Sequence, residues 1–194
     1  MTTQSTVTRA ASHKVETRAP RTNSAAAISL AVLRVSMGFV FLWAFLDKTF
    51  GLHYSTPSSG AWIHGGSPTR GFLKSVDVGP FQSWFHSIAG TWWADWLFML
   101  GLLGVGLTLI LGLLMYAGAA ASVALLGLMW LAEFPLAQHT NTGAASGSTN
   151  PFADYHYIYA VVLVVLALTG AARTWGLGQW WAARPVIRRY PWLR

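Results

Sequence analysis

Cysteine and charge are the two things this sequence lacks most. It contains no cysteine, which excludes disulfides, thiolate nucleophiles, cysteine-ligated zinc or iron–sulfur centres and covalent c-type haem. Only 10% of its 194 residues are charged, whereas soluble domains carry roughly 25%. The composition therefore argues against a water-soluble globule, and equally against a disordered chain, which would be polar and rich in charge.

Several functional motifs are also absent. There is no Walker A sequence and no dinucleotide-binding fingerprint. No pair of histidines has the spacing of a metal motif on a helix, so the sequence predicts neither a bound metal nor haem. The formal net charge of +7 is interpreted as topology information in so apolar a chain, and no nucleic-acid partner is expected.

What the chain does contain is long apolar runs. Between Leu97 and Ala132 no residue is charged over 36 positions. One helix of that length would span roughly 54 Å at 1.5 Å per residue, whereas the hydrocarbon core of a bilayer is about 30 Å thick. The run therefore predicts two helices joined by a turn within 112–118. Gly104, Thr108 and Gly112 form a small-residue stripe that predicts a helix contact.

The expected fold is an all-α membrane protein, a bundle of four transmembrane helices. The predicted spans are residues 25–46, 94–112, 117–134 and 155–172. They form a membrane domain over 25–175, between a disordered basic tail (1–24) and a second basic tail (176–194). A signal peptide is the competing interpretation of the first span. Its length, its internal Arg34 and the lack of a clear cleavage site favour an uncleaved helix.

The first connection between spans, residues 47–93, is too long for a simple link and predicts an extended outer loop. Residues 51–71 are rich in turn-forming types, whereas 78–93 carry a helical stripe of large apolar residues. This stripe comprises Phe81, Trp84, Phe85, Ile88 and Trp92. It predicts a short helix that lies in the membrane interface.

The distribution of lysine and arginine predicts the orientation. The two tails together hold nine basic residues, and the outer loops hold three. Because basic residues accumulate on the cytoplasmic side, both termini are expected there, with the chain embedded in the cell membrane. The lipid bilayer is then the first partner of this protein.

Arg34 lies well inside the first span, where an unpaired charge costs on the order of 2.5–3.5 kcal/mol. One explanation is snorkelling of the side chain towards the cytoplasmic interface. The other is an interior partner, either a carbonyl group or the head group of a quinone. No acidic residue lies at a matching depth, so an ion pair is not the obvious answer.

Most of the remaining ionisable residues fall at the outer ends of the helices. We expect four helix ends to bring a polar group to similar depth, which could form one pocket. These residues are Asp47, Lys48, Asp95, Glu133 and His156. The simpler explanation is helix capping and interfacial ion pairs, and Asp154 is well placed as an N-cap after Asn150–Pro151.

The functional interpretation assigns two roles to these positions. Arg34, Asp47, Lys48 and Asp95 are candidates for binding quinone or substrate. Glu133, Asp154 and His156 are candidates for proton transfer, because carboxylates and an imidazole that titrates near neutral pH suit that work.

Four stretches resemble the DoxX/DoxD family of small membrane proteins over about residues 28–192. They are LRVSMGFVFLWAFLDKTFGL (33–52), WIHGGSPTRGFL (62–73), DWLFMLGLLGVGLTLILG (95–112) and NPFADYHYIYA (150–160). In the first, the family pattern of an arginine, a glycine, an aromatic–leucine pair and a terminal lysine matches Arg34, Gly38, Phe41, Leu42 and Lys48.

The resemblance implies a redox role. DoxD-like proteins are membrane subunits of thiosulfate:quinone oxidoreductase, so a membrane quinone as electron acceptor, and a second redox subunit, are implied as partners. Other DoxX-like proteins are linked to oxidative-stress complexes, which implies the alternative of a non-catalytic membrane anchor or scaffold for such a partner. A channel is disfavoured by the uncharged middles of the last three predicted spans.

Overall fold

The computed structural model describes residues 24–193. All regular secondary structure in this range is helical, which confirms the all-α part of the predicted fold class. The four longest helices are α1 (Ser24–Phe50), α4 (Trp92–Leu111), α5 (Met115–Glu133) and α6 (Tyr155–Leu168). Apart from Ser24, the predicted amino-terminal tail lies outside the described residues.

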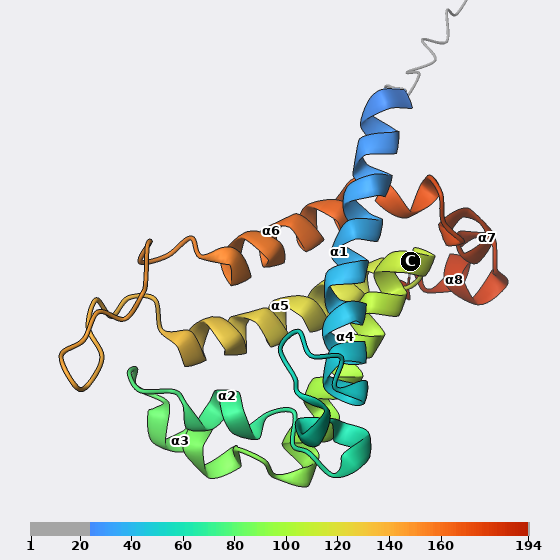
Figure 1. The fold of residues 1–194 in the computed structure, drawn as a ribbon. Helices are drawn as coiled ribbons and strands as arrows, with labels where there is room; N and C mark the ends of the chain where they lie inside the picture. The colour runs from blue at the N-terminus through green and yellow to red at the C-terminus, as the bar shows by residue number, and fades with distance from the viewer. Residues whose placement is uncertain (1–23, 194) are drawn as a thin grey trace, which may run out of the picture.

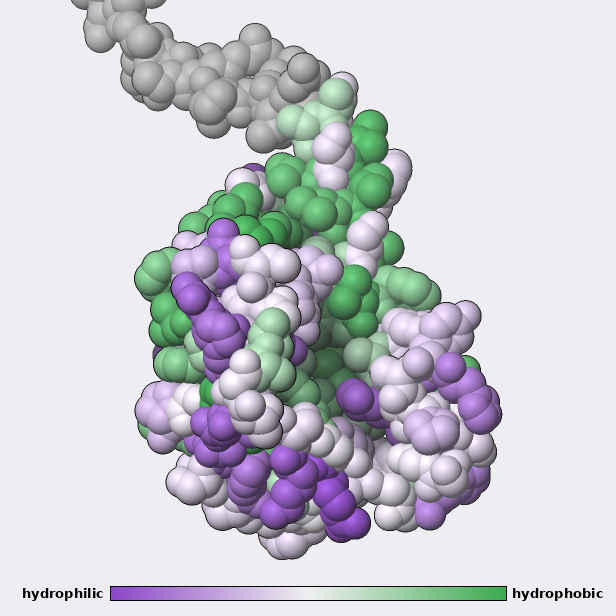
Figure 2. Space-filling model, turned by 60° about the vertical axis from the view of Figure 1, so that its left-hand side comes forward, coloured by the Kyte–Doolittle hydropathy of each residue, from purple (hydrophilic) through white to green (hydrophobic). Residues whose placement is uncertain are grey.

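Three of these helices, α1, α4 and α5, are long and apolar enough to cross a membrane, and α6 is a shorter apolar helix of 14 residues. All four expose large hydrophobic side chains, such as Phe39 on α1, Leu100 on α4, Leu128 on α5 and Leu168 on α6. In the face that Figure 2 shows, hydrophobic surface (green) occupies mainly the upper part and hydrophilic residues gather in the lower part. Exposed apolar surface of this extent indicates contact with a lipid bilayer.

The long helices form two pairs. α1 packs along α4 and α5 packs along α6, and in Figure 1 the first pair runs across the second. We call the end at which α4 turns into α5 the terminal end, because α1 begins and α6 ends on that side of the molecule. The opposite end, which carries residues 51–91 and 134–154, is called the loop end. The pairs meet at the terminal end and diverge towards the loop end (Figure 1).

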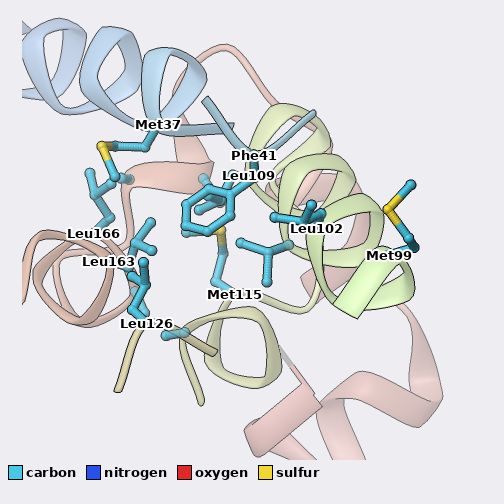
Figure 3. Close-up of a cluster of buried hydrophobic side chains, with 14 residues drawn as sticks. Met37, Phe41, Met99, Leu102, Leu109, Met115, Leu126, Leu163 and Leu166 are labelled. Atoms are coloured by element: carbon cyan, nitrogen blue, oxygen red, sulfur yellow. The ribbon is translucent and has the colours of Figure 1, made fainter. Parts of the chain in front are cut away.

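The core lies between the two pairs. Side chains from all four helices meet in one apolar cluster, as Figure 3 shows for Phe41, Leu109, Leu126 and Leu163. Methionines such as Met37 fill the irregular spaces between them, a role that their flexible side chains suit. This cluster fixes the pairs relative to each other and so determines which helix ends are neighbours.

The turn between α4 and α5 confirms the predicted hairpin. Gly112 ends α4 in the left-handed conformation (φ +70°), and its N–H donates to the carbonyl of Thr108 at 2.9 Å. Glycine adopts this backbone conformation at little cost, so it is a common helix terminator. α5 starts at Met115, two residues earlier than predicted, so the connection is only a few residues long.

α1 and α4 approach most closely at two glycines, one on each helix. A Cβ on Gly38 would lie 2.8 Å from the side chain of Ile110, and a Cβ on Gly106 would lie 2.9 Å from the backbone nitrogen of Leu42. Of the predicted contact stripe, Thr108 does face a neighbouring helix, since a Cβ on Gly118 of α5 would collide with its side chain, whereas a Cβ on Gly104 would meet nothing within 4 Å. The sequence pattern shows that small residues recur but not which side of the helix faces α1.

Gly106→Ala is expected to destabilise the protein by about 1–3 kcal/mol, because the obstructing atoms belong to the backbone of α1 and cannot rotate away. Unfolding in mixed micelles, followed by far-ultraviolet circular dichroism, would measure the change. Gly104→Ala is the matched control on the same helix and is expected to be neutral or slightly stabilising. Equal effects of the two substitutions would contradict the close approach.

The long loop after α1 folds back onto the end of α5. Its short helices α2 (Arg70–Lys74) and α3 (Gln82–Ile88), together with the connection between them, contribute Leu73, Phe85 and Val76 to a small apolar cluster that includes Ala132 of α5. α3 lies within the predicted helical stripe but is shorter, because Gly90 (φ +76°) interrupts the chain before α4 begins. This loop thus forms a wall beside the end of α5.

The chain after α6 also differs from a simple tail. It forms α7 (Gly178–Ala182), α8 (Pro185–Arg189) and a short 3-10 turn at Pro191–Leu193 that packs on α5. Ile187 is buried, and the indole N–H of Trp181 donates to the carbonyl of Leu193. Apolar side chains between the arginines hold this segment against the terminal end, although its basic character suggests a tail.

Candidate functional site

Three candidate side chains meet where α5 ends and α6 begins. His156 Nδ1 lies 2.8 Å from a carboxylate oxygen of Asp154 and 3.7 Å from one of Glu133. Tyr155 completes the group, because its hydroxyl donates to the other carboxylate oxygen of Glu133 at 2.9 Å. We call Glu133, Asp154, Tyr155 and His156 the loop-end cluster.

Helix termination explains why these residues are neighbours. Phe134 adopts a positive φ (+43°) ahead of Pro135 and ends α5 directly after Glu133. Asp154 caps α6, because its other carboxylate oxygen accepts the N–H of Tyr157 at 3.0 Å. Since α5 and α6 run antiparallel side by side, the last residue of one and the first turn of the other lie together.

His156 is the buried member of the cluster. It is 1% exposed, and its Nε2 has no hydrogen-bond partner in the structure. The ring of Tyr155 packs against the imidazole with 4.0 Å between centroids. Burial and packing hold Nδ1 towards the two carboxylates, so any proton on that nitrogen is shared with Asp154.

A pocket of about 350 Å³ opens beside the cluster and is lined by Glu133, Asp154 and Tyr155, with His156 behind them. The folded loop supplies the facing wall, including Asp77. Asp77 also joins the two loops, because it accepts the N–H of Asn141 at 3.0 Å and its carbonyl accepts the Asn141 side-chain amide. The described lining residues include three carboxylates and no lysine or arginine.

Two kinds of chemistry suit this arrangement. Glu133, Asp154 and His156 each offer a donor atom, all within 4.8 Å of one another, so they have the spacing to hold a metal ion together. The same atoms form a continuous set of proton donors and acceptors from the pocket to a buried imidazole. The expectation that the chain binds no metal or haem stays a prediction.

Arg34 does not join this cluster. Its guanidinium is fully buried at the terminal end and donates to four backbone carbonyls. They belong to Leu109 and Ile110 at the end of α4 and to Thr174 and Trp175 after α6. Carbonyls at the carboxyl end of a helix have no intrahelical partner. A cation there also interacts favourably with the negative end of the helix dipole. The sequence leaves a carbonyl group or a quinone head group open as the interior partner of Arg34. In the structure, its hydrogen-bond partners are backbone carbonyl groups.

The other three candidates lie on the α1–α4 pair, away from the loop-end cluster. Asp47 accepts the N–H groups of Tyr54 and Ser55, and Asp95 accepts hydrogen bonds from Ser67 and Thr69. Both carboxylates thus tie the loop between α1 and α4 to a helix end. Lys48 is half-buried, with its ammonium 5.9 Å from the ring centroid of Phe98.

The structure therefore brings together three of the seven sequence-predicted site residues. Asp47, Lys48 and Asp95 do not line the pocket beside Glu133 and Asp154, and the α1–α4 and α5–α6 pairs diverge towards the loop end (Figure 1). Sequence reasoning misses Tyr155 and Asp77. The position of Tyr155 between two candidates is a usable signal, whereas nothing in the sequence marks Asp77 as a neighbour of residue 141.

Comparisons with protein-family models, with curated proteins and with solved structures find no match to this chain. The resemblance to the DoxX/DoxD family accordingly rests on the residues quoted above, and the redox role that it implies is treated below as a proposal.

Proposed function

We propose that this chain is the membrane subunit of a quinone-linked oxidoreductase and that the quinone head group binds in the loop-end pocket. The observation that carries the proposal is the loop-end cluster, in which two carboxylates, a phenol and a buried imidazole meet beside a cavity at the end of an apolar helical domain. The resemblance to DoxD-like proteins supports the same function.

The proposed topology has four membrane spans with both termini on the cytoplasmic side of the cell membrane. Three spans are the long apolar helices, and α6 is the fourth. At 1.5 Å per residue, its 14 residues cover roughly 21 Å, so the bilayer thins locally or flanking residues complete the crossing. The excess of basic residues in the two tails supports this orientation.

The electrostatics of the pocket favour a neutral ligand that takes up protons. Its lining carries Asp77, Glu133 and Asp154 without a basic residue, so a thiosulfate dianion would be repelled. A quinone head group is uncharged, and its carbonyl oxygens accept hydrogen bonds. A volume of about 350 Å³ lies within the range of ligand pockets.

The reaction balances as follows. One quinone takes two electrons and two protons to form a quinol, and two thiosulfate ions lose two electrons as they join into tetrathionate. In the proposal, Glu133 and Asp154 would relay protons to the quinone oxygens: Asp154 would take up its proton from His156 across their 2.8 Å contact, and the exposed Glu133 would take up its proton from water. Because the pocket repels anions, thiosulfate is assigned to a partner subunit, which passes the electrons.

A second candidate function is a non-catalytic anchor that recruits a redox partner. It is favoured by the fact that both terminal nitrogens of Arg34 donate to backbone carbonyls of the chain, and that Asp47 and Asp95 accept hydrogen bonds from the loop after α1. These residues stabilise the fold and leave little for a substrate to bind. In this alternative the loop-end surface is the partner's docking face.

The test is quinone binding and reduction by the chain in lipid nanodiscs. A short-tailed quinone titrated into the sample is expected to quench tryptophan fluorescence saturably, since the indole N–H of Trp130 donates to the carbonyl of Phe152, between the pocket-lining residues Asn150 and Asp154. Thiosulfate and the co-purified partner are then added, and quinone reduction is followed by absorbance. Absence of saturable quinone binding would exclude the enzyme and leave the anchor.

A further inference from the structure

A second pocket, of about 280 Å³, opens at the terminal end and has no part in the proposed quinone chemistry. Its walls come from the α4–α5 turn, the last turn of α6 and the segment that follows. Most lining residues are apolar or glycine, namely Gly112, Met115, Ala167, Gly170, Ala172, Gly178, Trp181 and Ala182. The polar ones are Tyr116, Arg173 and Gln179. The pocket is therefore amphipathic, with one cation.

Arg173 is available to an external anion. It is exposed, and within residues 24–193 every salt bridge involves His156, so no carboxylate neutralises this guanidinium there. The Gln179 side chain donates to the Arg173 carbonyl at 2.8 Å and holds its backbone in place. The sequence from Tyr155 onwards contains five arginines and no aspartate or glutamate. This end of the molecule thus attracts negative charge.

The surroundings of the pocket are those of a membrane surface. Leu168, on the last turn of α6, is 70% exposed, so the adjoining helix surface faces lipid. Trp175 and Trp180 are exposed beyond it, and the guanidinium of Arg184 lies 3.8 Å from the ring centroid of Trp180. Tryptophan and arginine gather where a membrane meets water. In the proposed topology, Arg173 follows the last turn of α6 and therefore falls at the depth of lipid head groups.

We propose that this terminal-end pocket binds an anionic phospholipid. Arg173 binds the phosphate, Tyr116 and Gln179 lie beside the head group, and one acyl chain runs along α6 past Leu168. The residue at 170 is glycine with φ +68°, and a Cβ there would come within 3.3 Å of Arg173 Nε, so its absence leaves room for the arginine side chain. A free phosphate ion would leave the apolar walls in contact with water, whereas a lipid covers them.

Native mass spectrometry of the full chain, extracted from nanodiscs of phosphatidylcholine with or without phosphatidylglycerol, would test this proposal. We expect retained phosphatidylglycerol on the wild type. Arg173→Ala is expected to weaken retention about fivefold, as for one basic residue at an anionic surface, and Arg173→Lys should restore part of it. Since Arg173 is exposed, circular dichroism should show both variants folded.

Three further measurements distinguish lipid binding in this pocket from general electrostatic attraction to the basic end of the molecule. Arg188→Ala removes an exposed charge from the same end without lining the pocket and should change retention much less. Ala182→Leu fills part of the apolar wall without changing charge and should weaken retention. Equal losses for Arg173→Ala and Arg188→Ala, or displacement of the lipid by equimolar inorganic phosphate, would overturn the proposal.

Discussion

Replacing Arg34 with methionine is expected to destabilise the protein by about 3 kcal/mol or more. Methionine keeps much of the buried volume but donates no hydrogen bond, so the carbonyls of four residues lose their donor at once. Each buried polar group left without a partner costs about 1–3 kcal/mol. Unfolding in mixed micelles, with helix content as the signal, would measure the loss.

Two further variants make this prediction specific. Arg34→Lys keeps the charge, but a single ammonium cannot reach carbonyls on both α4 and the segment after α6, so an intermediate loss is expected. Arg188→Met, on the exposed surface of the same end, should stay within about 0.5 kcal/mol of the wild type. Unchanged stability of Arg34→Met would mean that the arginine does not hold the fold, and would revive the hypothesis that it binds a ligand.

The second large effect concerns proton delivery. Asp154→Asn is expected to lower the rate of quinone reduction about a hundredfold, because an amide does not exchange protons as a carboxylate does. Asparagine is as good an N-cap as aspartate, so the hydrogen bond to the Tyr157 N–H should persist and stability should change little. The variant thus separates the chemical role of Asp154 from its structural one.

The comparison with Asp154→Ala completes this test. Alanine removes both the proton-exchanging group and the cap, so it should lose activity and also about 1 kcal/mol of stability. Wild-type turnover in Asp154→Asn would show that Asp154 serves only as the N-cap of α6 and would remove it from the proposed proton path. A thermal stabilisation by divalent metal ions that disappears in the variant would instead assign Glu133, Asp154 and His156 to a cation.

The helices could be predicted from the sequence because apolar runs and their terminators are local features. The uncharged run ending near Ala132 required a turn, and Gly112 supplied it. The fourth helix was predicted too long, since Thr169 and Gly170 end it after Leu168 although the composition stays apolar. Crossing of the helix pairs has no local signature, because it depends on which small residues face a neighbour.

The candidate site was predictable only where sequence neighbours became spatial neighbours. Asp154 and His156 share the first turn of one helix, and Glu133 ends the preceding one, so a simple hairpin joins them. The partners of Arg34 were not predictable, because they are backbone carbonyls 75 to 141 residues away along the chain, and carbonyls are present at every position. Asp95 is similar, since its partners are hydroxyl and amide groups of a distant loop.

The four carbonyl contacts of Arg34 also impose an order on biogenesis. Two of the acceptors lie at the end of α4, but Thr174 and Trp175 are synthesised only after α6. In a nascent chain that has inserted only α1, α4 and α5, the Arg34 guanidinium therefore lacks half of its hydrogen-bond acceptors. Synthesis of the segment after α6 therefore stabilises α1 as well as α6. A chain truncated before residue 174 should be recognised as unfinished by membrane quality control.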